Sequence, residues 1–149
     1  MRSAVPAFKK ALLERLEKTK ALAEVTVSWG NPYPDDAGDE VIIIGNTTGK
    51  GKGHVAGLSQ ANEVFSVDII ISVVGSAQTG LKELVERAYE LAEAVDDSVI
   101  DWAKEPVKYG GVVTMVVPGL WSDGEAVTDD GDWREASVIT QLDVTARIS

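Results

Sequence analysis

The feature that most constrains the fold is a long alternation of apolar and polar residues over residues 136–148. Its odd positions are mostly polar, with Ile139 as the exception. Successive side chains of a β-strand point to opposite faces, so a period of two predicts one strand buried on a single face. At about 3.3 Å per residue, it would be about 43 Å long, more than twice the usual length. Such a strand must pair along its length, within the subunit or partly with a neighbour, since an open apolar edge invites association. The even positions predicted to face the core are Ala136, Val138, Thr140, Leu142, Val144, Ala146 and Ile148.

The rest of the chain divides into helical and extended stretches. Apolar residues recur at helical spacing over residues 5–23 and in a segment that begins after Thr79, a suitable N-cap, and ends between Asp96 and Asp101. Adjacent strands joined without helices favour antiparallel pairing, and two amphipathic helices can cover one face of a sheet. We therefore predict an α+β fold in one domain, residues 1–149, with a mainly antiparallel sheet of about five strands and both helices on one face (order αβββαββ). The strands expected before the last one are residues 25–29, 41–44, 63–74 and 112–117.

Residues 45–60 have no periodicity and are rich in glycine. This composition predicts a flexible loop or the tip of a protruding hairpin. Its Gly-Lys dipeptide is not a phosphate loop, because only three residues separate Gly45 from Gly49, and Gly51 stands where a Ser or Thr must follow Lys50. We expect mobility in the free subunit and order on contact with a partner. The candidate contact residues are Lys50, Lys52 and His54.

Composition excludes several classes of site. There is no cysteine and His54 is the sole histidine, so thiol chemistry and multi-histidine metal sites are excluded. The formal net charge is −10, which disfavours a sequence-independent grip on DNA. No apolar run is long enough to cross a bilayer, and the first ten residues lack a secretion signal. We expect a soluble intracellular protein without cofactor or metal, whose acidic groups at residues 35–40 and 123–132 lie in solvated loops.

Three further residues are candidates for partner binding. Trp121 and Trp133 flank an acidic segment, where an aromatic side chain can anchor an interface or simply cap the end of the sheet. Asp143 lies on the polar face of the last strand, which meets either solvent or a neighbouring subunit. No catalytic residue is predicted, because the carboxylate pairs lack the apolar surroundings that shift a pKa and His54 has no partner in a nucleophile motif.

Three segments together resemble the tail terminator proteins of long-tailed bacteriophages, and more loosely the related tail-completion and neck proteins. They are the helix at residues 4–23, the strand and helix at residues 63–71 and 79–95, and the closing segment 133–139 with its alternating strand. The resemblance implies a structural virion protein, not an enzyme: a subunit of a hexameric ring that caps the tail tube, ends its polymerisation and joins it to the neck.

The same resemblance implies the partners and the location. The partners would be further copies of this chain, the major tail tube protein and neck or connector proteins. DNA would pass through the pore without specific binding, and no membrane would be involved. The protein would be assembled in the bacterial host cytoplasm and reside at the tail–neck junction of the virion. Acidic loops could line such a pore, and long sheet edges suit ring contacts.

Other functions remain open from the sequence. The first is a head-to-tail joining or neck connector subunit of the same kind of virion. A second is a small soluble enzyme with acidic active-site loops, and a third is a cellular sheet-forming adaptor. Light scattering separates these classes, because a chain that is monomeric at all concentrations does not fit a self-assembling ring.

Overall fold

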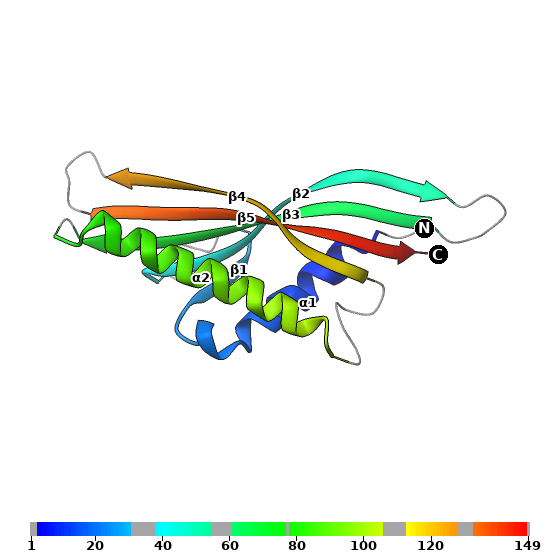
Figure 1. Cartoon of the computed structure of the whole chain (residues 1–149), viewed down its shortest axis with the longest axis horizontal. Coiled ribbons are helices and arrows are strands. Elements are labelled where there is room, and N and C mark those ends of the chain that lie inside the picture. The colour runs from blue at the N-terminus through cyan, green and yellow to red at the C-terminus, as the bar shows by residue number, and fades with distance from the viewer. Residues whose placement is uncertain are drawn as a thin grey trace.

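The computed structural model describes residues 3–30, 38–54, 61–76, 78–105, 113–127 and 133–148, and confirms the α+β class (Figure 1). The two long helices and the five strands follow the predicted order. A short 3-10 helix separates the first long helix from the first strand. The elements are α1 (Val5–Glu17), the 3-10 helix η1 (Lys20–Leu22), β1 (Thr26–Trp29), β2 (Glu40–His54), β3 (Ala61–Ser76), α2 (Leu81–Trp102), β4 (Val113–Val127) and β5 (Trp133–Ile148).

The five strands form one sheet in the order β1-β2-β3-β5-β4. All neighbours are antiparallel except β1 and β2, which are parallel, so the sheet is mixed. Helix α1 contacts β1 and β2, whereas α2 contacts β3, β4 and β5. Both helices therefore lie on one face of a strongly twisted sheet, as predicted (Figure 1).

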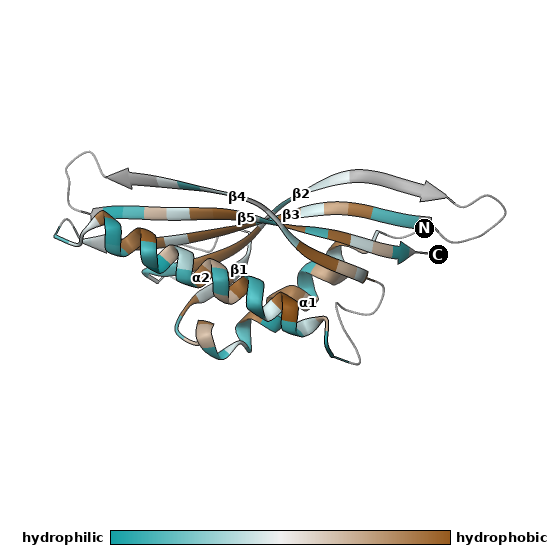
Figure 2. Ribbon diagram, viewed as in Figure 1, coloured by the Kyte–Doolittle hydropathy of each residue, from teal (hydrophilic) through white to brown (hydrophobic). Residues whose placement is uncertain are grey.

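The core lies between that face and the helices. Every even position of β5 from Ala136 to Ala146 is buried, and Leu142 and Val144 are fully inaccessible. The alternation in β3 is almost as strict, since each odd residue from Phe65 to Val73 is buried and Ser66 is the one buried residue at an even position between them. Apolar residues occupy the central part of the strands, where the helices cover the sheet (Figure 2). The period of two thus identified the core face of both strands.

Phe8 connects the three parts of this core. Its ring lies 6.0 Å from that of Phe65 on β3 in an edge-to-face arrangement, and 6.2 Å from that of Trp102 on α2 in a stacked one. Phe8 is fully buried, together with Leu12 and Leu16 one and two turns later on α1. One stripe of α1 therefore packs on the sheet and on the end of α2.

Three predicted helix boundaries are wrong. Helix α1 ends at Glu17 and is followed by η1, so residues 5–23 are not one helix. Thr79 is not the N-cap of α2: that position is Gly80, and the Thr79 hydroxyl lies 3.3 Å from the Ser76 hydroxyl within the preceding turn. Helix α2 ends at Trp102, one residue later than expected.

The fourth strand is also longer than predicted. Pro118 and Gly119 do not end it, and β4 continues to Val127. Proline is tolerated because β4 is an edge strand and its register against β5 shifts between Pro118 and Trp121. The acidic loop expected after residue 119 is therefore a strand up to residue 127, and residues 128–132 lie outside the described parts of the chain. Glu40, expected in a solvated loop, begins β2 and accepts hydrogen bonds from Arg87 at 2.6 and 3.0 Å.

The glycine-rich segment is a strand as far as the structure describes it. β2 runs to His54 and pairs with β3, with register shifts between Ile44 and Thr47 and between Gly49 and Gly51. Residues 45–54 are therefore not a loop but one arm of the β2–β3 hairpin, and the predicted tip lies outside the described residues. Backbone pairing needs no apolar pattern, which explains why the periodicity missed this strand. Residues 55–60, to which the predicted mobility also applied, lie outside the described residues.

Two contacts tie this hairpin to α1. The Ala4 backbone N–H donates to Glu63 Oε1 of β3 at 2.7 Å, and Lys9 Nζ donates to the Gly45 carbonyl of β2 at 2.7 Å. Burial lowers the pKa of Lys9, and the nearby Asp68 carboxylate opposes this effect. The hairpin extends beyond α2 on the side where both termini lie (Figure 1). Helix α1 is thus bonded to β2 at Gly45 and to β3 at Glu63, which is opposite Lys52.

The Glu63 contact gives a first prediction. A buried carboxylate at a helix N-terminus accepts one of the free backbone N–H groups and interacts favourably with the helix dipole. We expect Glu63→Ala to lower the free energy of unfolding by about 1–2 kcal/mol. Glu63→Gln keeps an acceptor and should lose less. Urea denaturation followed by circular dichroism measures both, and wild-type stability in Glu63→Ala would contradict the capping role.

Candidate assembly surface

The face of the sheet opposite the helices carries apolar side chains. Among the described residues, no helix covers this face. Ile43, Ile70 and Ile139 lie side by side across β2, β3 and β5 in the strand register. Ile139 is 39% exposed, and Met115 and Val117 of β4, on the same face, are 52% and 44% exposed. We call this surface, defined by Ile43, Ile70, Ile139, Met115 and Val117, the helix-free face.

Polar pairs flank the isoleucine row. Ser66 Oγ donates to Asp143 Oδ1 at 2.7 Å, and Gln141 Nε2 donates to Asp68 Oδ1 at 3.2 Å. On the other side of the row, Ser72 Oγ donates to a carboxylate oxygen of Glu135 at 2.9 Å. A mixture of exposed apolar residues and mutually satisfied polar groups is typical of a surface that meets a protein partner.

Two long edges of the sheet are unpaired in the described parts of the chain. β1 pairs only with Val41 to Ile44 of β2, so the outer side of residues 45–54 has no neighbouring strand. The outer side of β4 likewise has none. Unpaired N–H and C=O groups along an edge are a template for pairing with another chain. The sheet therefore presents two edges as well as one face for assembly.

The six predicted contact residues do not form one site. Lys52 and His54 lie on the outer half of β2, opposite Glu63 and Ala61, whereas Trp133 is opposite Ser76 at the other end of the sheet. The side chains of Lys50, Lys52, His54 and Trp133 lie outside the described part of the structure. Asp143 and Trp121 are described in full, and they lie on opposite faces of the sheet.

Trp121 lies on the helix side of β4. Trp121 is 63% exposed. Its ring lies edge to face with the Tyr89 ring of α2, and the two ring centroids are 5.4 Å apart. Tyr89 donates a hydrogen bond to Asp123 Oδ2 at 2.6 Å, and this bond raises the pKa of Tyr89. Trp121 is therefore an exposed aromatic residue in contact with α2, and the interface-anchor interpretation stays a prediction for it.

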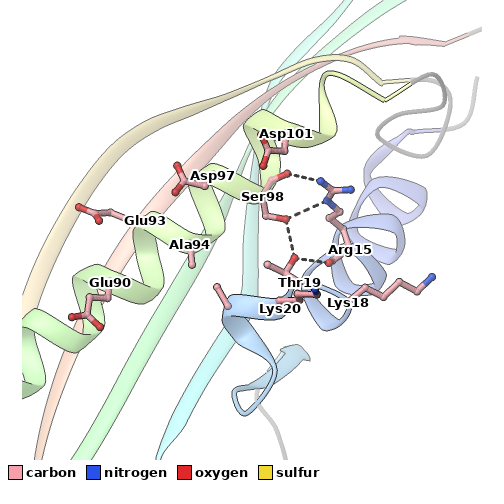
Figure 3. A pocket seen from close by; sticks show the side chains of 11 residues that line it. Arg15, Lys18, Thr19, Lys20, Glu90, Glu93, Ala94, Asp97, Ser98 and Asp101 are labelled. Atoms are coloured by element: carbon pink, nitrogen blue, oxygen red, sulfur yellow. Dashed lines mark hydrogen bonds between the residues drawn. The ribbon is translucent and has the colours of Figure 1, made fainter.

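A polar cleft of about 660 Å³ separates α1 and η1 from α2 (Figure 3). Arg15 crosses it: Nε donates to Ser98 Oγ at 3.2 Å, Nη2 donates to the Ser98 carbonyl at 3.1 Å, and Nη1 pairs with Glu105. The Thr19 and Ser98 hydroxyls lie 2.9 Å apart. Arg15 also lies over the Trp102 ring, 5.9 Å from its centroid. These bonds join α1 to α2. The polar groups at the centre of the cleft are therefore already hydrogen-bonded to one another.

No three acidic or histidine side chains lie close enough together to hold a metal ion in the described ranges. Neither helix in those ranges combines the length and apolarity of a membrane span.

Sequence reasoning placed Asp143 on this face as a possible contact with a neighbouring subunit, but it missed the apolar row. The available signals were Ile43, within the apolar run 41–44, and Ile70 and Ile139, which break the alternation of β3 and β5. Met115 and Val117 gave none, since the register shift between Val113 and Met115 decides which face they occupy.

Comparison with known proteins shows a likeness to solved structures. No protein-family model and no curated protein matches the sequence. Among solved structures, the fold is similar to a chain in the virion of a native gene transfer agent particle. The TM-score is 0.58, the alignment covers 98% of this chain and 100% of that chain, and 16% of the aligned residues are identical. At this identity, the likeness establishes a shared fold.

Proposed function

We propose that this protein is a structural subunit of a tailed, phage-like virion. The observation that carries the proposal is the fold shared with a gene transfer agent virion chain over nearly the whole length of both chains. Two properties of the described surface support it: the apolar helix-free face and the two unpaired sheet edges. An assembly role explains these features without any catalytic group.

We further propose that copies join through the two edges. In the sheet order, β2 and β5 are parallel to each other and β4 is antiparallel to both. A rotation about an axis along the strands keeps every strand direction, so β4 of one copy would meet β2 of the next copy antiparallel. Because the two edges are different, this contact is head-to-tail, and it produces a ring if the rotation closes.

The finer role that fits best is a tail terminator. A ring that caps the tail tube needs surfaces for its neighbours, for the tube and for the neck. In this subunit the two edges would serve the neighbours, and the helix-free face is available for a further partner. The net charge of −10 suits a pore that DNA traverses without being held. A neck or head-to-tail connector is the alternative, because it would also form a ring around the DNA path.

Deleting the gene from a particle-producing host and imaging the particles by electron microscopy tests the proposal. Loss of a terminator leaves tube polymerisation unchecked, so we expect tails of uncontrolled length. Normal-length tails detached from filled heads would identify the connector instead. Particles indistinguishable from wild type would contradict a virion role altogether.

A further inference from the structure

Two exposed tryptophans are the ends of one row of residues that crosses all five strands. Trp29 of β1 is opposite Ile44 of β2, which is opposite Ile69 of β3. Ile69 is opposite Thr140 of β5, and Thr140 is opposite Trp121 of β4. Residues directly opposite one another carry their side chains on the same face of a sheet. The three inner residues are buried on the helix side, whereas Trp29 is 47% and Trp121 63% exposed. The row therefore ends at each edge of the sheet in an aromatic ring that the subunit covers only in part.

Each ring contacts the helix that lies next to its edge. Lys9 Nζ of α1 lies 5.9 Å from the centroid of the Trp29 ring, and the Tyr89 ring of α2 lies edge to face with Trp121. Asp123, two residues after Trp121 and on the same face of β4, accepts the Tyr89 hydrogen bond. The Trp29 end of the row thus carries an ammonium group and the Trp121 end a carboxylate. Opposite charges of this kind favour contact between the two ends.

We propose that Trp121 of one copy packs against Trp29 of the next copy. The inference rests on the proposed ring, in which copies are related by a rotation about an axis along the strands. Such a rotation leaves every residue at the same level along the axis. Because Trp29 and Trp121 share one level and one face, the rotation that joins the two edges also brings these two rings together. Large aromatic side chains buried on association are typical of the residues that carry most of the binding energy.

The outlines of the two edges fit this contact. β1 pairs with Val41–Ile44 of β2, so at the level of the row a neighbouring β4 reaches β1 before it reaches β2. β1 is parallel to β2, so this contact is also antiparallel. β1 ends at this level and leaves a step beside the outer half of β2, and the register shift of β4 between Pro118 and Trp121 lies level with the step. A register shift of this kind bends a strand, so the first part of β4 can follow β2 while the second part lies beside β1.

Cysteine cross-linking tests the contact, because the natural chain contains no cysteine. Residues opposite each other on neighbouring antiparallel strands have Cα atoms about 4.5–5.5 Å apart, within the range of a disulfide. The double variant Trp29→Cys, Trp121→Cys should therefore form covalent chains longer than a dimer under mild oxidation, whereas each single variant can form a dimer at most. The matched control is Trp29→Cys, Met115→Cys. Met115 is also exposed on β4, but it is level with Val64 of β3, about 17 Å from the row, so this pair should not cross-link.

Sedimentation velocity measures how much the two rings contribute to self-association. Trp29→Ala and Trp121→Ala should each weaken association on the order of tenfold, with melting temperatures close to wild type. If the rings contact each other, the double variant should lose much less than the product of the two single losses. Ile100→Ala is the control, because Ile100 is 48% exposed but lies on α2, outside the row, and it should associate like wild type. Wild-type association of either tryptophan variant, or a double variant that loses the full product, would overturn the inference.

The ring and the tryptophan contact can fail separately. If the wild-type chain is monomeric in solution, the same cysteine pairs are oxidised in purified particles, where the copies are assembled. A wild-type chain that associates neither in solution nor in particles contradicts the proposed ring and the contact with it. A wild-type chain that assembles, while its Trp29→Cys, Trp121→Cys variant also assembles but does not cross-link, overturns the tryptophan contact alone.

Discussion

Leu142→Asp is expected to lower the free energy of unfolding by about 3–5 kcal/mol, which is a large part of the roughly 5–15 kcal/mol that stabilises a typical domain. Leu142 is fully buried in the middle of β5, opposite Val67 of β3 and Pro118 of β4. The substitution removes the leucine packing and places a carboxylate, with no partner for its charge, beneath the helices. Urea denaturation followed by circular dichroism measures the loss, and the variant should be partly unfolded at ambient temperature.

Asp143→Leu is the matched control on the adjacent position. Sequence alone predicts little loss, since Asp143 lies on the other face of the strand. The structure raises this expectation to about 1 kcal/mol, because Ser66 Oγ loses its acceptor at 2.7 Å. Equal destabilisation by the two substitutions would show that β5 is buried on both faces. If the helix-free face meets a neighbour, Asp143→Leu should alter association more than melting.

The parts of the fold that sequence predicted are those in which burial follows a regular period. β3 and β5 each pack one face against the helices, so the residues at every second position are buried, from Val67 to Val73 and from Ala136 to Ala146. The sequences of the outer half of β2 and the second half of β4 show no such alternation of apolar and polar residues. Both segments are held in the sheet by backbone hydrogen bonds. Gly51 in β2 and Pro118 in β4 are tolerated because each of these strands has an open edge.

The candidate site was less predictable because it depends on register. Ile43, Ile70 and Ile139 are far apart in the sequence and meet only through the pairing of β2 with β3 and of β3 with β5. Asp96 and Asp97 illustrate the same limit. They are adjacent and chemically identical, yet a rotation of about 100° along the helix directs Asp96 toward the β4–β5 pair and Asp97 into the cleft beside α1.

Phe8→Ala is the second substitution with a large expected effect, a loss of about 3–5 kcal/mol. Phe8 is fully buried and its ring contacts both Phe65 and Trp102, so the cavity would open where α1, β3 and α2 meet. The surrounding side chains come from three different elements and cannot all move inward together. Phe8→Leu fills part of the space and should lose clearly less. Thermal and urea unfolding measure both variants.

The part of the structure that loosens first in Phe8→Ala should also be measurable. Helix α1 carries the Lys9 bond to Gly45, and its N-terminus is bonded to Glu63, so weakening its packing should loosen the outer half of the β2–β3 hairpin before the centre of the sheet. Hydrogen exchange in Phe8→Ala should therefore accelerate in residues 45–54 more than in β5. Uniform acceleration across the sheet would show that the hairpin is held by strand pairing alone. Selective acceleration would show that α1 positions the edge through which we expect the copies to join.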